Sequence, residues 1–284
     1  MVDLNPSIYS LIALALLTIL LAISYLSKDR LTMPASFKFV WIFFLAITIS
    51  EWFSFTLALW ILALLSFCAL REFFSLVDIR LEDRWGILVS YLSIPCMFYL
   101  VQINWYGFFI IAIPVYAFLI MPYFVALGGR SKGIVFSVGA LDFGLFFYVF
   151  CLGHICYLIF FSERMALLMI LAVTITDFIF RYFQHRSYGL RCIFQITCIT
   201  PFYLILTKWS GIPIEHCVAL GIIIPVASCM GQFTLKEMEQ DLGIQAERLQ
   251  PGRGRTIEAL KSYLFTVPAV FHYLRWFLKW GDLP

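Results

Sequence analysis

Long apolar runs separated by short polar intervals make up most of this 284-residue chain. An α-helix needs about 20 apolar residues to cross a hydrocarbon core of ~30 Å. The runs predict ten membrane-spanning helices, and a count of eight to ten fits the length of the chain. In chain order they cover residues 8–26, 39–49, 53–70, 85–101, 105–127, 134–161, 166–180, 192–206, 217–230 and 263–278. The run at 134–161 is too long for one straight span, so we expect it to tilt or to begin at the interface.

The composition excludes a soluble globular protein. Hydrophobic residues make up 62% of the chain and charged residues 13%, whereas soluble domains contain nearer one half and one quarter. We therefore predict an all-α fold, a polytopic membrane helical bundle that forms a single integral membrane domain over residues 1–284. No basic segment precedes the first apolar run, which we expect to be retained as a span. The eight cysteines form no C-x-x-C pair and are expected to be packing residues.

The basic residues gather on one side of the predicted membrane. With ten spans, sixteen of the twenty Lys and Arg residues fall in alternate loops, and four fall in the opposite set. Cytoplasmic loops carry the excess of basic residues in membrane proteins. The polar loops at 71–84, 128–133, 181–191 and 231–262 are therefore predicted to be cytoplasmic, with both termini outside. A bacterial inner membrane is the expected location.

The longest polar interval, residues 231–262, contains the candidate binding site. Its segment Pro251–Arg255 reads P-G-R-G-R and places glycines beside arginines. Glycine lets backbone N–H groups approach an oxyanion, and a guanidinium fork can bind the same oxyanion. The residues predicted to bind a phosphate group of a lipid are Gly252, Arg253, Gly254, Arg255, Lys261 and Arg186. The alternative is that the basic residues only set topology and contact anionic head groups.

Three polar residues lie inside or near the ends of apolar runs. A charged side chain there costs about 2.5–3.5 kcal/mol on insertion scales, so each residue is a functional candidate. Asp177 either pairs with Arg181 one helical turn later or acts in catalysis. His154 either makes an interhelical hydrogen bond or acts as a catalytic base. Asp142 is expected to be interfacial.

The polar interval and two upstream segments contain motifs in a particular order. Gly231-Gln232 precedes Pro251–Ser262, which reads P-G-R-G-R-T-I-E-A-L-K-S and is followed by the last apolar run. Upstream, Asp177 is followed by Tyr182-Phe183, and Leu70–Phe74 reads L-R-E-F-F. These motifs resemble the CTP:phosphatidate cytidylyltransferase (CDP-diacylglycerol synthase) family, whose pattern is G-D, S-x-x-K-R, K-D and P-G-H-G-G-x-x-D-R-x-D-S before a last span. The resemblance implies the fold of that family, and a site in which carboxylates hold divalent metal against the phosphates of CTP and phosphatidate.

The chain departs from this pattern mainly at charged positions. Gln232 stands at the acid of G-D, Glu239-Gln240 stands at K-R, and Arg253 stands at the family's His. Of the D-R-x-D acids, Glu258 is a conservative exchange and Lys261 reverses the charge. The site has therefore lost acids and gained arginines, which favours phosphate binding over metal-assisted transfer.

The resemblance implies catalytic roles for Asp177 and Glu258, with Asp177 the one candidate metal ligand. Our hypothesis is a CDP-diacylglycerol-synthase-like membrane protein of phospholipid metabolism that binds an anionic phospholipid, such as phosphatidate, and whose catalytic motif is eroded. The alternative is an active CTP:phosphatidate cytidylyltransferase that makes CDP-diacylglycerol, and only then are CTP and Mg²⁺ expected as substrate and cofactor. A transporter or an acyl-transfer enzyme that uses His154 is a third interpretation. No nucleic acid partner is expected, and a homodimer is an open option.

Overall fold

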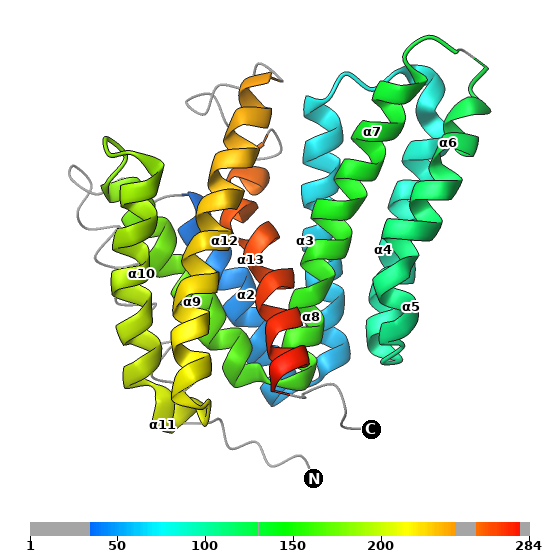
Figure 1. Cartoon of the computed structure of the whole chain (residues 1–284). Coiled ribbons are helices and arrows are strands. Elements are labelled where there is room, and N and C mark those ends of the chain that lie inside the picture. Colours follow the sequence, from blue (N-terminus) through cyan, green and yellow to red (C-terminus); the bar gives the residue numbers. More distant parts are fainter. Residues whose placement is uncertain (1–34, 130, 242–253, 279–284) are drawn as a thin grey trace.

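The protein is an all-helical bundle in the part of the chain that the structure describes. The structure is a computed structural model and describes residues 35–129, 131–241 and 254–278 (Figure 1). Its elements are α2 (Ala35–Trp52), α3 (Phe55–Leu76), η1 (Leu81–Asp83), α4 (Arg84–Gln102), α5 (Tyr106–Ile111), η2 (Ala112–Ala117), α6 (Phe118–Ala126), α7 (Ile134–Leu145), η3 (Phe146–Cys151), α8 (Leu152–Phe161), α9 (Glu163–Tyr182), α10 (Tyr188–Ile205), α11 (Thr207–Ser210), α12 (Ile214–Asp241) and α13 (Arg255–Phe277).

The predicted all-α polytopic bundle is confirmed. Seven continuous helical runs among the described residues are long and apolar enough to cross a membrane. These runs are α3, η1–α4, α5–α6, α7–α8, α9, α10 and α12. The apolar helix Val40–Trp52 is shorter, and α13 carries charged residues in its first two turns. The span predicted at 8–26 lies outside the described residues, so the count of ten stays a prediction.

The long apolar run at 134–161 forms one unbroken helical segment of 28 residues. Its middle part, η3, is π-helical, and α7 and α8 continue the segment on either side. At 1.5 Å per residue the segment is about 42 Å long, which exceeds the ~30 Å hydrocarbon core. Most of its apolar surface is buried inside the bundle, so its length and apolar character reflect a core position.

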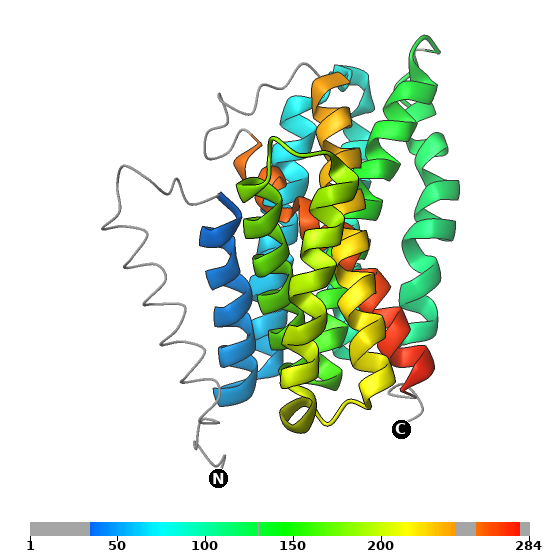
Figure 2. The same cartoon turned by 60° about the vertical axis from the view of Figure 1, so that its left-hand side comes forward.

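Helix α13 occupies the centre of the bundle. It packs against α2, α3, α8, α9 and α12, and Figure 2 shows it enclosed by these neighbours. The helices α4–α6 lie at one edge in Figure 1 and α10 lies at the other. Because α13 runs in the opposite direction to α3, α9 and α12, its first turns meet the last turns of those three helices.

The polar interval at 231–262 is helical over most of its length. Helix α12 continues to Asp241 and α13 already begins at Arg255. The two helices approach closely at Gly231, where an added Cβ would lie 2.5 Å from the carbonyl oxygen of Lys261. Only glycine fits such an approach without displacing a backbone. The glycine therefore fixes Lys261 against α12.

The short link between α3 and α4 is fastened by a buried carboxylate. Asp83 accepts hydrogen bonds from the Arg80 backbone N–H and guanidinium and from the Ser137 hydroxyl on α7. The hydrogen bond with Asp83 raises the pKa of the Arg80 guanidinium above its usual value. These contacts hold α3, α4 and α7 together at the end of the bundle that contains the candidate site.

Candidate functional site

Polar side chains from four helices converge where α13 begins. We call this group the polar cluster. Its members are Glu72 of α3, Asp177 and Arg181 of α9, Gln232 and Glu239 of α12, and Thr256, Glu258, Lys261 and Ser262 of α13. Apart from Arg181 and Glu258, these residues are buried. The described positions that carry the family resemblance, which come from segments nearly two hundred residues apart in the sequence, thus lie at one end of the bundle.

Asp177 lies at the centre of the first part of the polar cluster and is only 3% exposed. Its Oδ1 accepts hydrogen bonds from the Gln232 side-chain amide and the Ser262 hydroxyl. The same amide nitrogen lies 2.6 Å from the Ser262 hydroxyl oxygen. Below them, the hydroxyl groups of Thr176 and Ser228 lie 3.0 Å apart. Asp177 is therefore held by neutral donors on α12 and α13.

Lys261 lies at the centre of the second part and is also 3% exposed. Its ammonium group pairs with the Oε2 atoms of both Glu239 and Glu258. The other oxygen of Glu258 accepts from the Arg181 guanidinium at 3.3 Å. Arg181, which the sequence offered as a partner for Asp177, thus contacts a different acid. The result is a chain of alternating charges that links α9, α13 and α12.

The charge reversals found in the sequence fall on two residues that bind each other. Glu239 stands where the family pattern has a basic residue, and Lys261 stands where it has an acid. In the structure these two side chains form a buried ion pair. Relative to the pattern that the chain resembles, the two departures therefore compensate each other in charge.

Glu72 anchors the first turn of α13. Its Oε2 accepts from the Thr256 backbone N–H at 2.8 Å, and its Oε1 accepts from the Thr256 hydroxyl at 2.7 Å. Both residues are buried. A carboxylate is favourable here because the amino terminus of a helix carries unpaired N–H groups and the positive end of the helix dipole.

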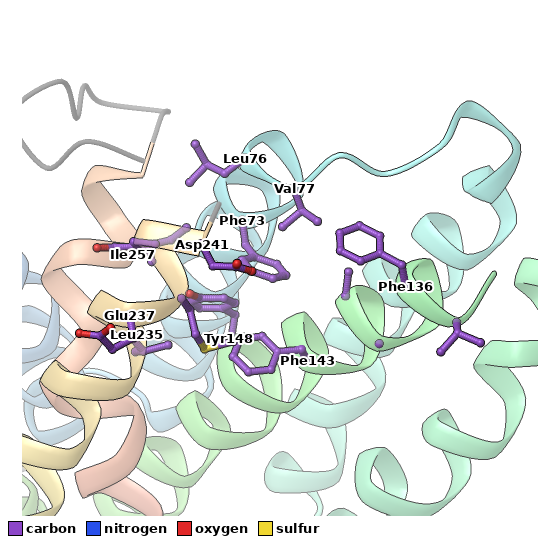
Figure 3. A pocket seen from close by; sticks show the side chains of 15 residues that line it. Phe73, Leu76, Val77, Phe136, Phe143, Tyr148, Leu235, Glu237, Asp241 and Ile257 are labelled. Atoms are coloured by element: carbon purple, nitrogen blue, oxygen red, sulfur yellow. The ribbon is translucent and has the colours of Figure 1, made fainter. Parts of the chain in front are cut away.

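An apolar cavity of about 490 Å³ opens beside the polar cluster (Figure 3). Its walls come from α3, α7, η3, α12 and α13, and the rings of Phe73, Phe143 and Tyr148 lie close together among the side chains that line it. Carboxylates of α12 lie along it, among them Glu239. Since Glu239 also binds Lys261, the cavity and the polar cluster share a side chain.

The predicted phosphate-binding residues are only partly brought together. Gly252 and Arg253 lie outside the described residues. Gly254 precedes α13 with φ +89°, a backbone conformation that suits glycine. Arg255 is the first residue of α13, whereas Arg186 lies on the exposed turn after α9. Phosphate binding by these residues stays a prediction.

His154 lies apart from the polar cluster. It is fully buried, and its Nδ1 lies 2.8 Å from the Phe150 carbonyl oxygen, while its Nε2 has no hydrogen-bond partner among the described residues. Its ring contacts that of His272 at 5.0 Å between centroids. His272 follows Lys261 by eleven positions on α13, or about 16 Å along the helix. The structure thus places His154 in an aromatic part of the core.

Several members of the polar cluster were not singled out as site residues by the sequence. Glu72 and Ser262 were noticed only as parts of motifs, and Glu239 only as a departure from one. Thr256 was part of the same motif as Ser262. Gln195, whose amide donates to the Thr176 carbonyl at 2.9 Å, lies outside the polar cluster and belongs to no motif. Polar residues in apolar helices are the general signal that would have found them.

The polar cluster does not fit the divalent metal that the resemblance implies. Such an ion needs several oxygen ligands. Asp177 already accepts from two donors through Oδ1, and Lys261 occupies the space between Glu239 and Glu258. Among the described residues no group of three or more His, Cys, Asp or Glu side chains is arranged to hold a metal ion.

Comparisons with known proteins link the chain to the predicted family only weakly. No family model matches it, and no solved structure matches it. It is 26% identical over 238 residues to the Escherichia coli K12 protein named "Uncharacterized protein YnbB", covering 75% of this chain and 78% of that one. It is 34% identical over 56 residues to a Synechocystis phosphatidate cytidylyltransferase, covering 19% of each chain.

Proposed function

We propose that the protein is a CDP-diacylglycerol-synthase-like integral membrane protein of phospholipid metabolism that binds an anionic phospholipid. The single observation that carries the proposal is the shared side chain of Glu239, which lines the apolar cavity and pairs with Lys261 in the polar cluster. An amphiphile with one apolar and one charged end matches such a combined site. The local similarity to a phosphatidate cytidylyltransferase supports this choice of ligand class.

The cavity suits an acyl chain. Its volume of about 490 Å³ lies within the usual range for small-molecule sites. Aromatic and aliphatic side chains dominate its walls, and each buried methylene group of a ligand contributes about 0.8 kcal/mol. The cavity lies between α7 and α12, which have apolar outer surfaces that fit a membrane environment.

The charged end of the lipid would meet basic residues that lie outside the polar cluster. Lys261 pairs with two carboxylates and Arg181 with one, so neither presents an uncompensated charge. Arg253 and Arg255 therefore remain the first candidates for contact with the phosphate group.

Lipid analysis by native mass spectrometry tests the proposal. Ala140→Phe fills the cavity, and Ala117→Phe places the same ring in a separate apolar groove between α4 and α6. We expect anionic phospholipid to copurify with the wild type and with Ala117→Phe but not with Ala140→Phe. Arg253→Ala/Arg255→Ala should lose anionic phospholipid selectively. Equal lipid content in all four proteins would refute the proposal.

An active CTP:phosphatidate cytidylyltransferase is the second candidate function. It is favoured by the 56-residue similarity to a protein of that name and by the presence of both predicted catalytic acids, Asp177 and Glu258, in one polar cluster. Conversion of CTP and phosphatidate to CDP-diacylglycerol by purified protein, abolished in Asp177→Ala, would establish this function and exclude an eroded catalytic motif.

A further inference from the structure

The ammonium group of Lys261 lies between two carboxylates, that of the buried Glu239 and that of the partly exposed Glu258. Glu239 reaches it from α12, and Glu258 reaches it from one turn earlier on α13. Each contact uses the Oε2 atom of the glutamate. The second oxygen of Glu258 contacts Arg181. The ammonium is thus enclosed by acids from two different helices.

Two carboxylates this close stay ionised together only when a cation lies between them. Like charges in a poorly solvated site cannot both stay ionised unless a positive charge compensates them. Mg²⁺ and Mn²⁺ often take this role in proteins with one or two carboxylates and several water molecules as ligands. Here the positive charge belongs to the chain itself, so no ion has to be recruited from solution.

The backbone holds this ammonium in position. At Gly231 the α12 backbone lies against the Lys261 carbonyl, with room for no Cβ. Lys261 is followed by Ser262, whose hydroxyl is bound to Asp177. The backbone at Lys261 is therefore fixed on both sides, and its side chain extends from a fixed position toward the two carboxylates.

We propose that Lys261 is a resident cation that occupies the position between Glu239 and Glu258 and thereby excludes divalent metal from it. Removal of the ammonium turns the two carboxylates into a site for Mg²⁺ or Mn²⁺. The idea concerns the same polar cluster as the lipid proposal but does not depend on which lipid binds. A measurement of metal binding alone therefore tests it, and either proposal can fail without the other.

Electron paramagnetic resonance of added Mn²⁺ with the purified full chain, above neutral pH so that protons compete weakly, provides the test. Lys261→Met removes the charge with little change of shape, and Lys236→Met does the same at an exposed position of α12. We expect the wild type and Lys236→Met to bind no Mn²⁺ up to about 1 mM, the range of weak carboxylate sites. Lys261→Met should bind one equivalent, and Glu239→Gln added to it should abolish the binding.

Three outcomes would overturn the proposal. The first is Mn²⁺ binding by the wild type that Glu258→Gln abolishes, because metal would then share the position with the ammonium. The second is a folded Lys261→Met protein that binds no Mn²⁺. The third is Mn²⁺ binding by Lys261→Arg, which keeps the charge. Recovery of folded Lys261→Met only when Mn²⁺ is present would support the proposal, since the metal would then replace the ammonium. Mn²⁺ binding by the wild type or by Lys261→Arg would overturn the proposal even if Lys261→Met does not fold.

Discussion

The contact between Glu72 and Thr256 should carry a large share of the stability of the polar cluster. Glu72→Ala removes the acceptor of two hydrogen bonds, to the backbone N–H and to the hydroxyl of Thr256, in a site where both residues are buried. Each orphaned buried donor costs about 1–3 kcal/mol, so the loss should total about 4 kcal/mol. Glu72→Gln keeps one carbonyl acceptor and should lose about half as much.

Reversible unfolding in mixed micelles with increasing SDS measures these free energies. Glu237→Ala, which removes an exposed carboxylate from α12, serves as the control and should change stability by less than about 0.5 kcal/mol. A double-mutant cycle with Thr256→Val isolates the hydroxyl contact. If Glu72→Ala costs no more than Glu237→Ala, then the carboxylate does not anchor the start of α13 and the reasoning fails.

Two further predictions concern the contact between α12 and α13. Gly231→Ala should be less stable than Gly139→Ala by about 1–3 kcal/mol in the same unfolding assay. Both substitutions raise helix propensity, but only the added methyl group at position 231 would collide with a neighbouring backbone. Equal effects would contradict the close approach of α12 and α13 at Gly231. Glu239→Lys and Lys261→Glu should each be destabilising, and the double variant should recover about 1–3 kcal/mol as coupling energy. A coupling energy near zero would mean that the ion pair of Glu239 and Lys261 does not form in the folded protein.

The helical architecture could be predicted from the sequence because its signal is local. A run of apolar residues long enough to span a membrane must form a helix, since lipid offers its backbone no other hydrogen-bond partners. Every span predicted between residues 39 and 278 has a helical counterpart. The extent of the polar interval was harder to predict, because polar residues are compatible with a loop and also with the buried helical ends seen up to Asp241 and from Arg255.

The site could be predicted only in part because its contacts join distant segments. Motif order identified Asp177 and Glu258, and the structure places both in one polar cluster. The partners of these acids were not evident, since nothing in the sequence says that Arg181 faces Glu258 or that Glu72 faces Thr256. Such pairs depend on how α3, α9 and α13 pack, which single-sequence patterns do not encode.

The paired reversal at Glu239 and Lys261 changes how the missing acids should be interpreted. Random decay of a catalytic motif would leave unpaired buried charges, each of which is strongly destabilising. Here an acid replaces a base, a base replaces an acid, and the two meet in a buried ion pair. A divalent ion brings two positive charges to a site, whereas one ammonium group brings only one. The negative charge of a phosphate bound nearby must therefore be neutralised in part by other cations. The arginines of the Pro251–Arg255 segment could supply that charge. Relative to the family pattern that the chain resembles, the missing acids and the additional basic residues are therefore two parts of one electrostatic arrangement.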